Sequence, residues 1–201
     1  MLLNVKSIRE NAKKSLFTDI NGDEHKWSFA YIFVKFIIPL ISCSIVYLND
    51  EKLMDDPKVI VMLLSLFSGL MFGVLIKIPD KFKDLEPKQN ESKQEETKRM
   101  QVKNYLKLFM YSLSYSILVA LFSIFFVILN SFFPFLILLD LSVYQFELDI
   151  QKIDVGATLL VILVIIYRIL LVNYLLNFLF FIFRAVTNLY EFMLYEFNKI
   201  K

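Results

Sequence analysis

The sequence predicts an all-α integral membrane protein with four transmembrane helices. Hydrophobic residues make up 57% of the chain, and its mean hydropathy is +0.58. The apolar residues are gathered in four segments, which are residues 29–48, 59–78, 105–129 and 155–184. A helix of about 20 apolar residues crosses the hydrocarbon core of a bilayer, which is about 30 Å thick. Each segment is therefore long enough to span a membrane.

Charged residues between the apolar segments predict the orientation of the helices. Lysine and arginine are frequent in residues 1–27, in residues 79–104 and after the fourth segment, whereas residues 49–58 and 131–154 are mainly acidic. Basic residues near the ends of transmembrane helices stay on the cytoplasmic side. We therefore expect both termini and the charged centre to be cytoplasmic.

This orientation divides the chain into parts with different environments. We expect a cytoplasmic amphipathic leader (1–27), a first transmembrane hairpin (28–78), a charged cytoplasmic connector (79–104), and a second transmembrane hairpin (105–201) with an outer loop (131–154) and a cytoplasmic tail.

The leader has apolar residues at helical spacing. Leu2, Val5, Ile8, Ala12 and Leu16 recur at steps of three and four residues. This pattern predicts a short helix lying on the membrane surface, with a frayed basic leader as the alternative. In the outer loop, by contrast, apolar and polar residues alternate over residues 144–151. Alternation predicts an extended strand, and a poorly ordered loop is the alternative.

Two cations lie inside the predicted spans and require an explanation. They are Lys35 in the first span and Arg168 in the fourth. A charge at the centre of a bilayer costs about 3 to more than 10 kcal/mol. Each side chain could extend to its nearer interface, which for Lys35 is the end marked by Trp27. Alternatively, Arg168 pairs with an outer-loop acid such as Asp140, or it lines a route for anions or water.

Small residues form a row on the second span. Ser65, Gly69 and Gly73 follow one another at four-residue steps. Helices in lipid associate closely where such small residues let their backbones approach. The row therefore predicts a helix contact, either within the chain or with another copy.

Polar residues form a further row on each of the last two spans. They are Ser112, Ser116, Ser123 and Asn130 on the third span, and Asn173 and Asn177 on the fourth. Polar side chains avoid lipid, so both rows should face protein or water. One interpretation is hydrogen bonding between helices, and the other is a water-filled path.

The sequence contains no pattern typical of an enzyme. His25 is the only histidine and Cys43 the only cysteine, and neither has a partner at the spacing that catalysis or metal binding requires. We expect a protein without enzymatic activity, cofactor or metal. The basic residues lack interleaved aromatic residues, so nucleic-acid binding is not predicted either.

In layout the chain resembles the small four-span membrane proteins of bacterial antiphage defence modules. Examples are the membrane component of the Kiwa system and the membrane accessory proteins of type VI-B CRISPR loci. The shared features are the length, the four spans and the charged centre, without a diagnostic motif. The resemblance implies a homo-oligomer that contacts a cytosolic effector or sensor.

These observations lead to two hypotheses of function. The first is a non-enzymatic oligomeric scaffold or sensor of the bacterial inner (cytoplasmic) membrane, which recruits a cytosolic protein partner through residues 79–104. The second is a pore-forming or membrane-perturbing effector with its polar rows facing water. A small transporter is a weaker alternative, because no broken helix or internal repeat is evident.

Overall fold

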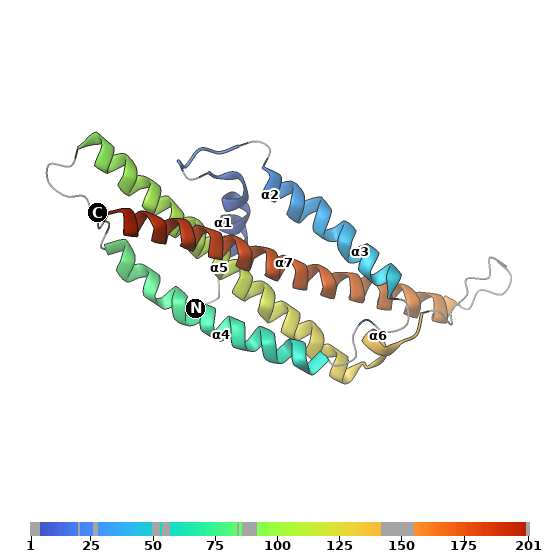
Figure 1. Ribbon diagram of the computed structural model, residues 1–201. Coiled ribbons are helices and arrows are strands. Elements are labelled where there is room, and N and C mark those ends of the chain that lie inside the picture. The colour runs from blue at the N-terminus through green and yellow to red at the C-terminus, as the bar shows by residue number, and fades with distance from the viewer. Residues whose placement is uncertain are drawn as a thin grey trace.

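The computed structural model describes residues 5–19, 21–25, 28–49, 53, 57–83, 85, 92–141 and 155–199. Helices dominate these residues (Figure 1). The elements are α1 (Val5–Phe17), α2 (Phe29–Ile32), the π-helical turn η1 (Phe33–Ile37), α3 (Ile38–Leu48), α4 (Pro57–Lys83), α5 (Lys93–Phe132), α6 (Phe135–Leu138) and α7 (Val155–Lys199).

The predicted all-α class with four long apolar helices is confirmed. Within the described part of the chain, four helices have the length and apolar composition needed to cross a membrane: Phe29–Leu48, Pro57–Phe82, Lys93–Phe132 and Gly156–Leu194. The first of these consists of α2, η1 and α3 in direct succession. The orientation of the helices across the membrane remains a prediction.

The long helices are arranged around a central pair, α5 and α7. These two make the most extensive contact, while α4 packs on α5 and α3 packs on α7 (Figure 1). The helices of the predicted first hairpin therefore lie on different members of the pair. One core lies where α4, α5 and α7 meet, and it includes Met71, Phe109, Leu113 and Phe178.

The helices α5 and α7 are longer than their apolar segments. They contain 40 and 45 residues, which corresponds to about 60 and 68 Å, or about twice the thickness of the hydrocarbon core. Both helices continue into charged sequence because lysine, glutamate and glutamine favour helix as well as leucine does. The part of α7 after Arg184 was expected as a tail and is helical to Lys199.

The predicted connector, residues 79–104, is helical at both of its ends. The helix α4 continues through Pro79 to Lys83, and α5 begins at Lys93. Ser92 caps α5, because its hydroxyl accepts a hydrogen bond from the Glu95 backbone while the Glu95 carboxylate accepts one from the Ser92 backbone. This capping box satisfies backbone donors that an uncapped helix start would leave without partners.

A wide turn precedes Pro39 in the first long helix. The π-helical turn η1 covers Phe33–Ile37, and the backbone N–H of Ile38 donates to the carbonyl of Phe33, five residues earlier. Proline cannot donate to the residue four positions before it, and its ring clashes with that carbonyl. The wide turn thus lies directly before the residue at which an α-helical hydrogen bond would be lost.

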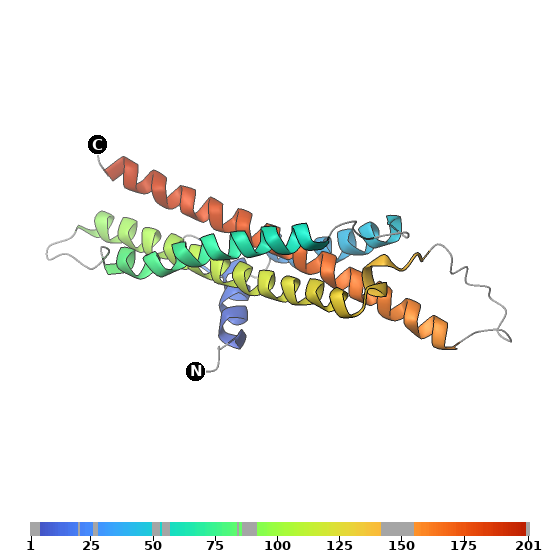
Figure 2. The ribbon, with the colours of Figure 1, turned by 90° about the horizontal axis from the view of Figure 1, so that it is seen from below.

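The helix α1 crosses the long helices at a steep angle (Figure 2). Ala12 and Leu16, two members of the predicted apolar row, are buried together with Phe181 of α7. The predicted leader helix is thus present over Val5–Phe17, with its apolar side packed on the bundle. Leu2 lies outside the described residues.

The first part of the predicted outer loop folds back onto the bundle. The helix α5 ends at Phe132, and after Pro134 the short helix α6 places Leu136 and Ile137 against Val164 and Leu171 of α7. The alternating segment 144–151, for which a strand is predicted, lies outside the described residues.

Candidate functional site

Arg168 is completely buried between α7 and α6. Its relative exposure is 0%. Its Nε donates to the carbonyl of Leu136 at 3.3 Å, and its Nη2 donates to the carbonyls of Ile137, at 2.8 Å, and Leu139. These carbonyls belong to the C-terminal end of α6, which has no further helical turn to satisfy them.

The carbonyl partners explain how this charge is accommodated. The C-terminal end of a helix carries a partial negative charge that a cation complements, and the Asp140 carboxylate adds an electrostatic attraction to Arg168. Asp140 was one of the acids considered from the sequence. That Arg168 binds backbone carbonyls was not predicted from the sequence, because only acidic side chains were considered as partners.

Lys35, the second cation, lies at the surface of its helix. Its Nζ is 5.3 Å from the ring centroid of Tyr31 and 5.5 Å from that of Phe36. Tyr31 precedes Lys35 by one turn, so the ammonium group is directed toward the end where α2 begins. An aromatic face attracts such a cation. That the side chain reaches the nearer interface remains a prediction.

The predicted serine row lies inside the bundle. Ser112, Ser116 and Ser123 each have a relative exposure of 0%. Ser116 donates to the carbonyl of Leu113 at 2.8 Å and lies 3.5 Å from the sulfur of Met71 on α4, while Ser123 donates to its own helix. The Ser112 hydroxyl is buried without a hydrogen-bond partner among the described residues. All three hydroxyls thus lie within the bundle.

The predicted asparagines differ in their contacts. Asn177 donates from Nδ2 to the carbonyl oxygen of Asn173 at 2.9 Å and to its Oδ1 at 2.7 Å. Asn130 is half-buried, and its Oδ1 has no hydrogen-bond partner among the described residues. The two rows on α5 and α7 are thus not joined by a described hydrogen bond between their members.

The small-residue row of α4 faces outward. Ser65, Gly69 and Gly73 are exposed, and a Cβ placed on either glycine meets nothing within 4 Å. The buried side of α4 carries Leu64 and Met71 instead. Within the described part of the chain, no helix packs closely on this row.

Arg184 forms a second arginine contact that the sequence pattern did not reveal. Its Nη2 donates to the carbonyl of Ser15, in the last turn of α1. Both arginines of α7 therefore hold the C-terminal end of a short helix, α6 in one case and α1 in the other. In the sequence, the only sign of these contacts is a cation that lies within an apolar helix and has no acid nearby.

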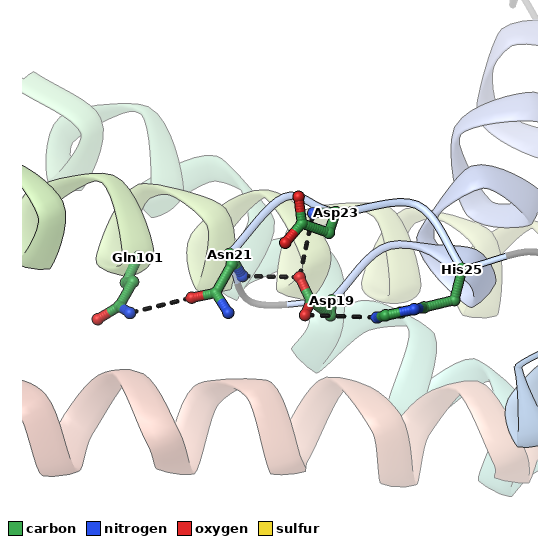
Figure 3. A network of polar contacts seen from close by, with 5 residues as sticks. All are labelled: Asp19, Asn21, Asp23, His25 and Gln101. Carbon is green, nitrogen blue, oxygen red and sulfur yellow. Dashed lines mark hydrogen bonds and ion pairs between the residues drawn. The ribbon is translucent and has the colours of Figure 1, made fainter.

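The turn after α1 is attached to α5 by polar side chains (Figure 3). The Asp19 carboxylate accepts hydrogen bonds from the backbone of Asn21 at 2.8 Å and of Asp23 at 3.1 Å, and it lies 3.5 Å from Nε2 of His25. Asn21 in turn accepts a hydrogen bond from Gln101 of α5 at 3.1 Å. The only histidine thus has a carboxylate partner.

These contacts determine the protonation of Asp19. Partial burial raises the pKa of its carboxyl group, but the hydrogen bonds from Asp23, His25 and Asn21, together with the charge of His25, outweigh this effect. The net result is a pKa below the usual value, because hydrogen bonds to the charged form stabilise it.

A cleft lies beside this turn, between α1 and α5. Its volume is about 270 Å³. Most of its lining residues have polar side chains, and they include two lysines, one from each helix. The lining residues are Asn11, Lys14, Ser15, Thr18, Asp19, Gly22, Asn104, Lys107, Leu108 and Tyr111.

The four long apolar helices are those of a multi-pass membrane protein. Among the residues described, no three histidine, cysteine, aspartate or glutamate side chains are placed to hold a metal ion together. Comparisons with protein-family models, with curated proteins and with solved structures gave no match to this chain.

Proposed function

We propose that this protein is a non-enzymatic, oligomeric membrane scaffold or sensor that recruits a cytosolic protein partner through residues 79–104. The observation that carries the proposal is the continuity of α5. Its charged first part, with Lys93, Glu96 and Lys98 exposed, continues without interruption into its apolar part. About half of its length of about 60 Å exceeds the hydrocarbon core. A rigid charged surface is thereby held away from the membrane, where a soluble protein can reach it.

The buried serine row supports a scaffold over a pore. Ser112, Ser116 and Ser123 have no exposed surface. Side chains that line a water-filled path need contact with water, whereas Ser116 lies against Met71 of α4 and Ser123 donates to its own helix. A pore-forming or membrane-perturbing effector remains the alternative, and it would need other residues for its path.

The open face of α4 supports assembly into an oligomer. Gly69 and Gly73 leave free space above the helix backbone, and small residues are the surface on which helices associate in lipid. We place the assembly in the inner membrane of a bacterium, with antiphage defence as its context. This setting rests on the resemblance in layout.

Charge reversal on the projecting part of α5 tests the recruitment of a partner. Lys93 and Lys98 would be replaced by glutamate in the full-length chain, and the proteins that copurify from the native host would be quantified by mass spectrometry. The matched control reverses Lys6 and Lys13, which are exposed on α1. We expect a specific cytosolic protein to be lost with the α5 variant only. Equal recovery from both variants would contradict the proposal.

Leakage from liposomes distinguishes the scaffold from the pore. Purified protein would be reconstituted into liposomes filled with a fluorescent dye and with potassium ions. We expect a release no faster than that from protein-free liposomes. Rapid release would favour the effector instead, and replacement of Ser112, Ser116 and Ser123 by alanine would then show whether these hydroxyls contribute.

A further inference from the structure

The cleft between α1 and α5 combines two cations at the level where α5 becomes apolar. Lys107 is the last charged residue of α5 before Phe132, and it lines the cleft opposite Lys14 of α1. The turn that carries Asn21 is attached to Gln101 of α5 (Figure 3), and its residues Asp19 and Gly22 line the cleft. If α5 spans the bilayer, the cleft lies beside the headgroup region.

The charges around the cleft leave both lysines available to an anion. Lys14 lies 3.0 Å from Glu24, but the two side chains are 65% and 61% exposed, and such exposed pairs contribute little. Lys107 has no ion pair with any described residue. Asp19 is the acid in the lining, and its charged carboxylate is paired with the backbone N–H groups of Asn21 and Asp23 and with His25 rather than with a lysine.

Neutral hydrogen-bonding groups complete the lining. Asn11, Asn104 and Tyr111 bring amide and hydroxyl groups from both helices. The volume of about 270 Å³ is slightly below the range for sites of drug-sized molecules, which begins at about 300 Å³. A group the size of a phosphate with a short substituent fits this space.

We propose that the cleft binds a phosphate group, carried either by an anionic phospholipid headgroup or by a free phosphate ion. Ammonium groups form short, charge-assisted hydrogen bonds with phosphate oxygens. Lysines near a membrane surface also attract anionic lipid. The two lysines come from different elements, so the bound phosphate would join α1 to α5. This inference does not depend on the proposed partner.

Gly22 brings the turn close to α5 beside the cleft. Its φ of 89° is in the left-handed region, which L-residues with side chains rarely adopt. A Cβ at this position would lie 3.3 Å from Nδ2 of Asn104. The positive φ therefore favours glycine at this position, and any larger residue would also require the Asn104 amide to shift by a few tenths of an ångström.

Matched lysine substitutions in the full-length chain test the site. The first variant combines Lys14→Gln with Lys107→Gln, and its control combines Lys13→Gln with Lys103→Gln, which are exposed neighbours outside the lining. A third variant, Glu24→Gln, releases Lys14 from its pair. One arm measures the binding of inorganic phosphate in zwitterionic nanodiscs. The other measures phosphatidylglycerol retained by the protein in native mass spectrometry.

The proposal predicts opposite effects for the two kinds of variant. The lining variant should weaken binding about tenfold or more in at least one arm, because it removes charge-assisted hydrogen bonds. Glu24→Gln should strengthen binding by about threefold, which matches the small contribution of an exposed pair. The control should bind as the native chain does. The arm that responds identifies the source of the phosphate.

Three results would overturn the proposal. They are equal weakening by the control, which would indicate unspecific attraction, no binding by the native chain in either arm, and no change with Glu24→Gln. Circular dichroism would show whether the lining variant folds. A variant with Lys14→Arg and Lys107→Arg, which keeps both charges, should retain binding within about threefold of the native chain.

Discussion

At the scale of single residues, α7 uses its two arginines to hold short helices by their carbonyl groups. Arg168 binds the end of α6, and Arg184 binds the end of α1. The guanidinium of Arg168 supplies several donors in a fixed plane, which suits its three carbonyl partners better than the single ammonium of lysine would. Arg184 donates to one carbonyl. The contacts fasten α1 and α6 to the same long helix.

Replacement of Arg168 tests this role. We expect Arg168→Met to lower the free energy of unfolding in mixed detergent micelles by about 3 kcal/mol, because the carbonyls of α6 would lose their donors while remaining buried. Arg168→Lys should recover only part of the loss. The control is Lys35→Met, which removes the exposed cation of the first span. A loss of similar size in the control would contradict the assignment.

The Asp19 carboxylate gives the turn after α1 a dependence on pH. Its pKa in the folded protein lies below the ordinary value of 3.8. The stability that it contributes should therefore be fully present above about pH 4 and be lost as the pH falls through the folded-state pKa. Hydrogen exchange at the amides of Asn21 and Asp23 would measure this loss.

In Asp19→Asn the same amides should exchange with little dependence on acid pH beyond the intrinsic exchange rate. The side chain of asparagine keeps an acceptor but has no charge to titrate. If the native chain and the variant responded to acid in the same way, another group would control the turn.

At the scale of elements, the outward face of α4 is the surface with the clearest consequence for assembly. A double substitution, Gly69→Leu with Gly73→Leu, should leave the fold of the single chain intact, because a Cβ at either position meets nothing within 4 Å. It should weaken association between copies, because leucine prevents a close approach of backbones. Energy transfer between labelled chains in liposomes would measure the association.

The matched control for α4 is Leu66→Ala with Leu70→Ala, on a neighbouring exposed side of the same helix. We expect this control to associate as the native chain does. If the glycine variant also associated normally, the row of small residues would not be the contact between copies.

At the scale of the whole molecule, the length of α5 makes the membrane topology testable with two labels. Gln94 and Ser131 lie near opposite ends of this 40-residue helix, about 56 Å apart at about 1.5 Å per residue. In a background with Cys43→Ser, single cysteines would be placed at these positions. A membrane-impermeant maleimide should label position 131 in intact cells, and position 94 only after the membrane is opened.

Labelling of both positions from one side would contradict a transmembrane α5 and the orientation expected from the basic residues. It would also remove the basis for placing the phosphate cleft beside the headgroup region. If position 94 were labelled in intact cells and position 131 only after the membrane is opened, α5 would still span the membrane. Only the predicted orientation would then be contradicted.

The sequence by itself determined the four long helices, because apolar segments of this length can satisfy their backbone groups in lipid only as helices. It also identified residues that share a helix face, such as Ser112, Ser116 and Ser123, because helical periodicity is a local property. The tertiary structure decided what these faces contact. The serines are buried in the bundle, whereas Gly69 and Gly73 face outward.

Only the tertiary structure could show how the charges within α7 are satisfied. Arg168 binds carbonyls about 30 residues earlier in the chain, and Arg184 binds the carbonyl of Ser15, 169 residues away. Every residue has a backbone carbonyl. The sequence therefore does not show which carbonyls lack a hydrogen-bond partner within their own helix and can accept from an arginine. The cleft between α1 and α5 depends on the same long-range packing, which brings Lys14 and Lys107 together across most of the first half of the chain.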